Sequence, residues 1–176
     1  MNTRSPFLEL TKQVASCFSI DLDSDAEARL LTWLDLLHQW NKRIDLSAAR
    51  NNEELVDLCL ADAFALSPSV PPNARVVDVG SGAGAPGLPL ALLRPDLQVT
   101  LVEPLTKRVS FLRTVIGTIG CKITVVRGRG EDHVKSTPNY DLAISRATLA
   151  PEAWLELGAK LVTRGQGRVI VMLARE

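Results

Sequence analysis

The 176-residue sequence predicts an α/β protein in which a helical region precedes a mostly parallel, Rossmann-like sheet. Apolar residues recur at helical spacing before residue 70, whereas short β-branched runs alternate with helix-like stretches after Pro71-Pro72. Such alternation is typical of parallel βαβ units with right-handed crossovers. We therefore expect an N-terminal helical region over residues 1–70, packed on a ligand-binding sheet domain over residues 71–176.

Three helices are predicted in the first 70 residues. In the second, apolar side chains recur at i, i+3, i+4 and i+7, and Ser24 with Glu27 predicts a capping box at its start. Trp33 and Trp40 share its apolar face, so we interpret both as core residues rather than as ligand-stacking residues. The predicted helices cover about Phe7–Phe18, Asp25–Lys42 and Asn52–Leu66.

The sheet domain contains five strand-like runs and three helix-like stretches. In parallel sheets of this kind, ligands bind at the carboxyl ends of the strands. Polar or glycine residues follow four of the predicted strands, which makes a site at that edge more credible than any single motif does. The predicted strands are Arg75–Val79, Gln98–Glu103, Lys122–Val126, Tyr140–Ser145 and Gly167–Met172; the predicted helices are Ala85–Arg94, Lys107–Ile119 and Pro151–Leu161.

A glycine-rich turn follows the first predicted strand. Asp78 is followed by glycines at alternate positions, Gly80, Gly82 and Gly84, before an apolar helix-like stretch. Glycine allows positive φ angles and lets a ligand approach the main chain closely. Glu103 ends the next predicted strand, about 20 residues further on, where a carboxylate can accept hydrogen bonds from both ribose hydroxyls. The pattern indicates a cofactor that contains adenosine.

The glycine spacing distinguishes two classes of cofactor. Dinucleotide-binding turns read G-x-G-x-x-G, whereas this turn reads G-x-G-x-G after an aspartate. The second form resembles motif I of class I S-adenosylmethionine methyltransferases, whose ligand has no pyrophosphate. We therefore favour S-adenosylmethionine and keep a nucleotide-dependent oxidoreductase as the alternative.

Composition narrows the class of protein further. The sequence has no apolar run of membrane-spanning length and no signal-peptide core at its start, so we expect a cytoplasmic protein without a membrane partner. Cys17, Cys59 and Cys121 have apolar neighbours and are predicted to be buried free thiols, and no metal-ligand spacing occurs. Residues 1–70 carry 6 Lys and Arg against 11 Asp and Glu, while residues 71–176 carry 14 against 9. A basic second half fits a polyanionic substrate, although it also fits an ordinary solvated surface.

Five segments of the sequence match one pattern: Trp40–Ser47, Asp78–Pro89, Glu103–Arg113, Arg127–Glu131 and Ile144–Ala147. Together they resemble one family, the bacterial 16S ribosomal RNA guanine-N7 methyltransferases, also called glucose-inhibited division protein B. The resemblance runs from about residue 25 to residue 170. The proline-glycine pair after the glycine turn and the Ser-Arg-Ala run are its more specific parts.

The resemblance implies a class I methyltransferase that binds S-adenosylmethionine and acts, as a monomer, on 16S rRNA or the 30S subunit. It places the cofactor over Gly80–Ala85, with the ribose facing Glu103, the adenine beside Gly130-Glu131, and Arg146 lining the site. The cofactor-binding set that we infer is Asp78, Gly80, Ser81, Gly82, Gly84, Ala85, Glu103, Gly130, Glu131 and Arg146.

Methylation of guanine N7 makes modest chemical demands. The N7 atom carries a lone pair and no proton, so its attack on a sulfonium methyl group needs no general base. Alignment and stabilisation of the charge that passes onto the base are what the enzyme supplies. Arg146 is our candidate catalytic residue, with pairing to a carboxylate as the alternative, and Lys107, Arg108 and Arg129 are candidate RNA phosphate contacts, with plain solvation as the alternative.

Two departures from the family pattern raise an alternative function. Cys59 stands where the family usually has a histidine, three residues before the retained Asp62. The family also continues for some 40 residues beyond the fifth strand, whereas this sequence ends at Arg175-Glu176 and has Leu173-Ala174-Arg175 in place of the usual lysine-glycine. We therefore expect a shortened C-terminal sheet edge, and we keep a non-catalytic member that binds cofactor or RNA as the alternative.

Overall fold

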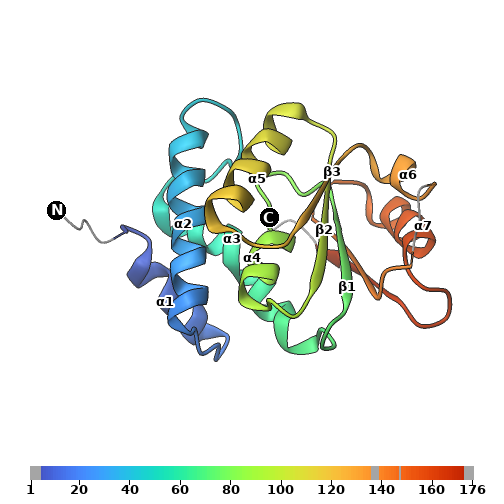
Figure 1. Cartoon of the computed structure of the whole chain (residues 1–176), viewed down its shortest axis with the longest axis horizontal. Coiled ribbons are helices and arrows are strands. Elements are labelled where there is room, and N and C mark those ends of the chain that lie inside the picture. The colour runs from blue at the N-terminus through green and yellow to red at the C-terminus, as the bar shows by residue number, and fades with distance from the viewer. Residues whose placement is uncertain (1–4, 136–138, 147, 173–176) are drawn as a thin grey trace.

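A computed structural model of the chain describes residues 5–135, 139–146 and 148–172. Within these residues, five strands form one sheet in the order β3-β2-β1-β4-β5, and every neighbouring pair is parallel. Helices cover both faces of the sheet (Figure 1). The strands are β1 (Arg75–Val79), β2 (Gln98–Glu103), β3 (Thr124–Arg127), β4 (Leu142–Arg146) and β5 (Arg168–Met172).

The predicted α/β architecture is confirmed, and most predicted bounds agree within two residues. The bounds of β1 and β2 match, whereas β3 and β4 begin two residues later than predicted. The helix after the glycine turn begins only at Gly87, since Ala85 and Pro86 belong to the turn itself. A four-residue helix, α6, was not predicted because it is too short to show an apolar period. The sheet-domain helices are α4 (Gly87–Leu93), α5 (Thr106–Ile119), α6 (Gly130–His133) and α7 (Pro151–Leu161).

The N-terminal helices form as predicted, but the start of the second one differs. Asp23 is the N-cap, and its carboxylate accepts a hydrogen bond from the Ala26 N–H at 2.7 Å. Ser24 is already the first helical residue, so the predicted Ser24–Glu27 capping box is wrong. An aspartate that directly precedes a serine offers an equally good cap one residue earlier. The elements are α1 (Leu8–Cys17), α2 (Ser24–Asn41), α3 (Asn52–Leu66) and the 3₁₀ turn η1 (Ser67–Ser69).

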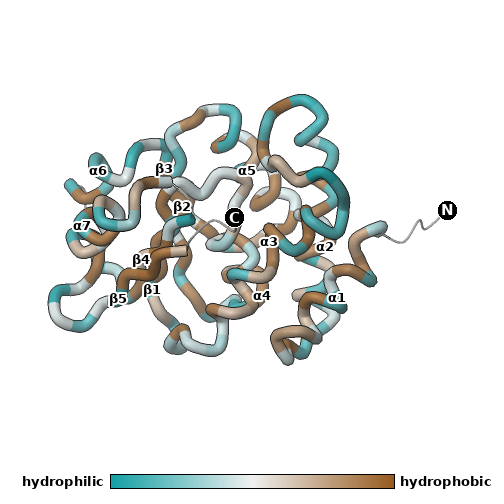
Figure 2. Tube along the Cα trace, turned by 180° about the vertical axis from the view of Figure 1, so that it is seen from behind, coloured by the Kyte–Doolittle hydropathy of each residue, from teal (hydrophilic) through white to brown (hydrophobic). Residues whose placement is uncertain are grey.

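Apolar residues of the strands alternate between two cores, one on each face of the sheet. Val76 packs in the larger core with α2–α5, whereas its neighbour Val77 packs on the opposite face with Trp154 of α7. The strands β1, β4 and β5 are accordingly among the most hydrophobic segments of the chain (Figure 2). Strands with apolar residues on both faces are the pattern expected for a parallel sheet covered by helices.

The N-terminal helices share the larger core with the sheet. Trp33 of α2 is fully buried, and the ring of Trp40 lies 5.6 Å from the ring of Phe111 in α5. The predicted core role of both tryptophans is therefore confirmed. The helices α2 and α3 thus pack directly on helices of the sheet domain, α2 on α4 and α5, and α3 on α4.

The thiols and the membrane prediction have mixed outcomes. Cys59 is buried and Cys121 is partly buried, but Cys17 is exposed at the end of α1, which contradicts its predicted burial.

Across the described ranges, no helix is long and apolar enough to cross a membrane, and no cluster of three or more potential ligands could hold a metal ion. The departure at Leu173-Ala174-Arg175 and the alanine of the Ser-Arg-Ala run, Ala147, lie outside the described residues.

The cap assignment at α2 makes a direct prediction. Asp23→Ala removes the side chain that accepts the Ala26 N–H, so the free energy of unfolding should fall by about 1 kcal/mol. Ser24→Ala is the matched control, because this exposed hydroxyl is at the first helical position, and its effect should stay below about 0.5 kcal/mol. Urea unfolding measures both values; a larger loss for Ser24→Ala than for Asp23→Ala would contradict the assignment.

Candidate functional site

The carboxyl ends of four strands bring the predicted site residues to one edge of the sheet. The glycine turn leaves β1, Glu103 ends β2, Gly130 and Glu131 follow β3, and Arg146 ends β4. The strands at this edge are neighbours in the sheet, which places these residues side by side as the parallel topology requires.

The glycine turn has the backbone conformation that its sequence predicts. Gly80, Gly82 and Gly84 have φ angles of +74°, +56° and +109°, values that side-chain-bearing residues rarely adopt. A Cβ atom placed on Gly82 would have its nearest neighbours, the Arg108 guanidinium and the Gly80 carbonyl oxygen, at 3.9 Å, so no close packing surrounds this part of the turn. Gly82 itself is partly buried, with the Arg108 side chain beside it.

Asp78 closes the turn from inside. Its carboxylate accepts the Gly87 N–H at 3.0 Å, and its carbonyl oxygen accepts the Ser81 hydroxyl at 2.9 Å. A Cβ atom on Gly87 would lie 2.7 Å from the same carboxylate, so glycine is required where α4 begins. Asp78 thus ties the end of β1 to the start of α4 and fixes the length of the turn between them.

The ionisation of Asp78 is strongly affected by its surroundings. Burial raises the pKa of Asp78 to about 7, although the Gly87 hydrogen bond and the positive charge of Arg146 favour the ionised form. The side chain is 1% exposed, and its Oδ1 atom has no hydrogen-bond partner among the described residues. An unpartnered oxygen in such a place is the kind of group that a proton, a water or a ligand satisfies.

Glu103 is held by main-chain donors. One carboxylate oxygen accepts the Gly82 N–H and the other accepts the Leu105 N–H, each at 2.9 Å. The residue is 2% exposed, and each oxygen keeps a second lone pair that can accept a further hydrogen bond. Glu103 therefore couples the glycine turn to the loop after β2.

Trp33 of α2 contacts the same turn and was not predicted to do so. Its indole N–H donates to the Ala83 carbonyl at 3.1 Å while its ring is fully buried. A tryptophan at helical spacing indicates only core packing, since the polar partner lies 50 residues away in the sequence. The helical region thus helps to hold the glycine turn.

Arg146 reaches from the end of β4 to α3. Its guanidinium donates to the Leu58 carbonyl and forms an ion pair with Asp62 at 3.2 Å. The carboxylate-paired alternative is therefore what the structure contains. The Arg146 side chain is still 25% exposed at the strand edge, so its catalytic role stays a prediction.

Beside the Arg146–Asp62 pair, burial raises the pKa of the Cys59 thiol to about 12, which keeps Cys59 uncharged.

The remaining predicted residues lie around this edge with fewer constraints. A Cβ atom on Gly130 would lie 2.8 Å from Val79, so close packing of α6 against β1 already accounts for that glycine. Glu131, Arg129 and Lys107 are exposed, and their predicted contacts remain predictions.

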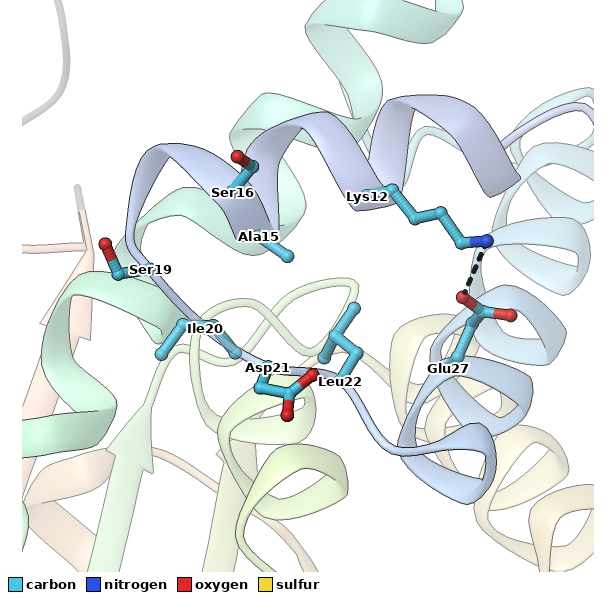
Figure 3. Close-up of a pocket in the computed structure, with 8 residues that line it drawn as sticks. All are labelled: Lys12, Ala15, Ser16, Ser19, Ile20, Asp21, Leu22 and Glu27. Atoms are coloured by element: carbon cyan, nitrogen blue, oxygen red, sulfur yellow. Dashed lines mark ion pairs between the residues drawn. The ribbon is translucent and has the colours of Figure 1, made fainter.

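One sizeable cavity lies away from this edge. It has a volume of about 520 Å³ and lies beside α1 and the segment that joins α1 to α2 (Figure 3). The ion pair between Lys12 and Glu27, 3.6 Å long, spans one side of it. None of the predicted site residues lines this cavity.

Comparison with known proteins identifies the family. The family model for GidB, described as rRNA small subunit methyltransferase G, matches residues 26–175. The chain belongs to this family. The match confirms the predicted resemblance, and the oxidoreductase alternative finds no support in it.

Individual relatives agree with the family model. A ribosomal RNA small subunit methyltransferase G from Anaeromyxobacter dehalogenans (strain 2CP-C) is 34% identical over 97% of this chain and 80% of its own length. One from Clostridium beijerinckii is 37% identical over 80% of this chain and 62% of its own length. One from Methylobacillus flagellatus is 42% identical over 73% of this chain and 62% of its own length. The chain thus spans between about three fifths and four fifths of these relatives.

Solved structures support the fold. A Plasmodium falciparum protein assigned to the protein-L-isoaspartate O-methyltransferases, in complex with S-adenosyl-L-homocysteine, has a TM-score of 0.58 at 17% identity and covers 96% of this chain and 84% of its own. Precorrin-6y C5,15-methyltransferase from Geobacter metallireducens has a TM-score of 0.56 at 12% identity and covers 74% of this chain and 67% of its own. The predicted class I methyltransferase fold is confirmed.

The buried carboxylate of Asp78 should dominate part of the pH dependence of stability. Its pKa is about 7 in the folded chain against 3.8 for an ordinary aspartate, so ionisation above pH 4 favours the unfolded chain. The free energy of unfolding should therefore fall, by on the order of 4 kcal/mol, as the pH rises from 4 to 7.5. Asp78→Asn should remove this fall in urea unfolding at several pH values.

Asp96→Asn provides a control of opposite sign. The hydrogen bond from Arg94 lowers the pKa of Asp96 to about 2, so its contribution is lost only below pH 4. This variant should keep the wild-type slope between pH 4.5 and 7.5. Equal slopes in wild-type and Asp78→Asn proteins would contradict the assignment of a raised pKa to Asp78.

Proposed function

We propose that the chain transfers a methyl group from S-adenosylmethionine to N7 of a guanine in 16S ribosomal RNA. The observation that carries the proposal is the family match over residues 26–175. The glycine turn and Glu103, both at the carboxyl edge of a class I sheet, support it from the side of the fold. We propose further that the protein works in the cytoplasm as a monomer, on the RNA or on the assembled 30S subunit.

The described residues suit S-adenosylmethionine. Gly82 has no side chain to keep a ligand away from the main chain, and the Glu103 carboxylate has lone pairs for ribose hydroxyls. The unpartnered Oδ1 of Asp78 lies under the turn and can accept a hydrogen bond directly or through water. We propose that the adenine lies beside Gly130 and Glu131. Gly80, Ser81, Gly84 and Ala85 would complete the cofactor-binding set together with Arg146.

When bound, S-adenosylmethionine would supply an electrophilic sulfonium methyl group: the N7 lone pair of guanine would form the new N–C bond as the C–S bond breaks, and S-adenosylhomocysteine would leave with the sulfur lone pair. No proton leaves N7, so the chain needs no general base at that atom. Cys59 agrees with this requirement, since its pKa of about 12 keeps it neutral and poorly nucleophilic. The proposed role of Arg146 is to border the base and orient it, while Asp62 holds the guanidinium in place.

A transfer assay tests the proposal. Radiolabelled S-adenosylmethionine is incubated with the protein and with 30S subunits or 16S RNA that lack the modification. Nucleoside digestion and mass spectrometry should then detect 7-methylguanosine. Tight binding of S-adenosylhomocysteine without any methyl transfer to either substrate would contradict the proposal and favour a non-catalytic member.

Glu103 should contribute strongly to cofactor affinity. A lost charged acceptor typically costs about 1.5–3 kcal/mol, so Glu103→Ala should weaken binding of S-adenosylhomocysteine roughly 10- to 150-fold in calorimetry. The variant also frees the Gly82 and Leu105 N–H groups, so a melting curve must confirm that it is folded at the titration temperature. A folded variant with an affinity within twofold of wild type would refute the ribose assignment.

Substitution of Arg146 should lower kcat, whereas substitution of Arg129 should raise KM for the RNA. Arg146→Ala should lower kcat at saturating RNA at least about tenfold, because the proposed role is in orientation of the base. Arg129→Ala should leave kcat unchanged and raise KM. Asp62→Asn separates the ion pair from the catalytic role, since it keeps Arg146 and should lower kcat less than Arg146→Ala does. An unchanged kcat for folded Arg146→Ala protein would contradict the role.

A further inference from the structure

A second concave surface lies beside the candidate site. It has a volume of about 460 Å³ and lies between the loop after α2 and the start of α5. The loop contributes Arg43, Ile44 and Asp45, and the residues after β2 contribute the other wall. We call this surface the α2–α5 groove; it is lined by Arg43, Ile44, Asp45, Leu105, Thr106, Lys107 and Arg108.

The loop wall of the groove is held in a defined shape. The Asn41 side chain accepts the N–H groups of Leu46 and Ser47, both at 2.9 Å, and donates to the Ser47 carbonyl at 3.1 Å. The Arg43 and Ile44 N–H groups also bond back to the Trp40 carbonyl. Both ends of the segment 42–46 are therefore fixed, and the groove is part of the fold rather than a chance gap at the surface.

The charge of the groove is unbalanced in favour of cations. It gathers Arg43, Lys107 and Arg108 around a single carboxylate, that of Asp45. No ion pair shorter than 4.0 Å joins any of the three cations to a carboxylate within the described ranges. Arg43 comes from the half of the sequence in which acidic residues predominate, yet it lines the same groove as the two cations of α5. Like charges that converge without partners favour a polyanion.

The groove also has an apolar wall. Leu105 is 53% exposed, a high fraction for a leucine, and partly buried Ile44 also lines the groove. Cations beside exposed apolar side chains suit single-stranded RNA, in which unstacked bases pack on such side chains while phosphates contact the cations. Duplex RNA would offer phosphates, hydroxyls and base edges to such a surface but no unstacked base face, since its bases are stacked on one another.

The groove adjoins the glycine turn without overlapping it. The Arg108 guanidinium lies 3.9 Å from the position of a Cβ atom on Gly82, and it donates a long hydrogen bond of 3.4 Å to the Asp45 carbonyl. Arg108 thus stands between the groove and the proposed cofactor site. An RNA strand in the groove would run directly past the place where the methyl donor is expected to bind.

We propose that the α2–α5 groove binds a single-stranded segment of the substrate RNA next to the target guanine. Arg43 and Lys107 contact phosphates, and Leu105 packs against a base. The inference rests on the proposed function for the identity of the RNA, but it assigns a surface and a residue, Arg43, that is not among the RNA contacts predicted from the sequence.

The experiment measures binding of a short single-stranded oligoribonucleotide by fluorescence anisotropy across a salt series, with S-adenosylhomocysteine at saturation. Arg43→Ala and Lys107→Ala should each weaken binding about threefold and together about tenfold. Each should lower the slope of log K against log salt by about 0.7, because each removes one phosphate contact. Leu105→Ala should weaken binding and leave the slope unchanged, since it carries no charge.

Arg113→Ala is the matched control. Arg113 is an exposed cation of α5, the helix that also carries Lys107, but it does not line the groove. Its loss should therefore change neither the affinity for the oligonucleotide nor the salt slope. Arg43→Ala should also leave the affinity for S-adenosylhomocysteine unchanged. Equal effects of Arg113→Ala and Arg43→Ala, unchanged affinity in the double variant, or stronger binding of duplex than of single-stranded RNA would overturn the groove assignment.

Failure of the groove and failure of the proposed function give different results. Competition between S-adenosylhomocysteine and the oligonucleotide would overturn the assignment of the groove to RNA, since it would make this surface part of the cofactor site. Methyl transfer by wild-type protein with unaltered RNA binding in Arg43→Ala and Lys107→Ala would overturn the groove alone. Loss of RNA binding in these variants, without methyl transfer by wild type, would support the groove and overturn the proposed function.

Discussion

The carboxylate of Asp78 is the constraint on which the candidate site depends. It is buried at the end of β1, and it accepts the N–H of Gly87 at the first residue of α4. The bond fixes both ends of the glycine turn, and its short span leaves no room for a Cβ atom at Gly87. Burial makes the arrangement costly, because the pKa of Asp78 rises to about 7 and one oxygen has no partner among the described residues. Ligand-binding sites commonly keep such a costly arrangement, because the turn must have its binding shape before the ligand arrives.

Contacts from other parts of the chain then hold the turn. Glu103 accepts the Gly82 N–H from the end of β2, and Trp33 donates to the Ala83 carbonyl from α2. Arg146 links the end of β4 to Asp62 in α3. The helical region is therefore part of the site's framework as well as a cover for one face of the sheet. A change in α2 or α3 can reach the site through these contacts alone.

The proposed chemistry suits such a framework. Transfer to N7 asks for positioning rather than proton removal, and the described residues at the strand edge supply hydrogen bonds and charge rather than a reactive nucleophile. Cys59, the neighbour of the Arg146–Asp62 pair, has a pKa of about 12 and offers no base. The α2–α5 groove extends the same logic to the RNA, since a strand held along it would approach the site from one defined direction.

Local patterns in the sequence determined the strands, most helices and the glycine turn, because the apolar period and glycine spacing act over a few residues. They also determined which residues would gather at the carboxyl edge, since parallel topology puts strand ends together. Only the tertiary structure decided the partners of those residues: Trp33 meets Ala83 50 positions away, and Arg146 meets Asp62 84 positions away. The cap at Asp23 was decided between two adjacent polar residues, and the four-residue helix α6 had no period to reveal it. Contacts between distant segments depend on packing of the whole core, which no local pattern encodes.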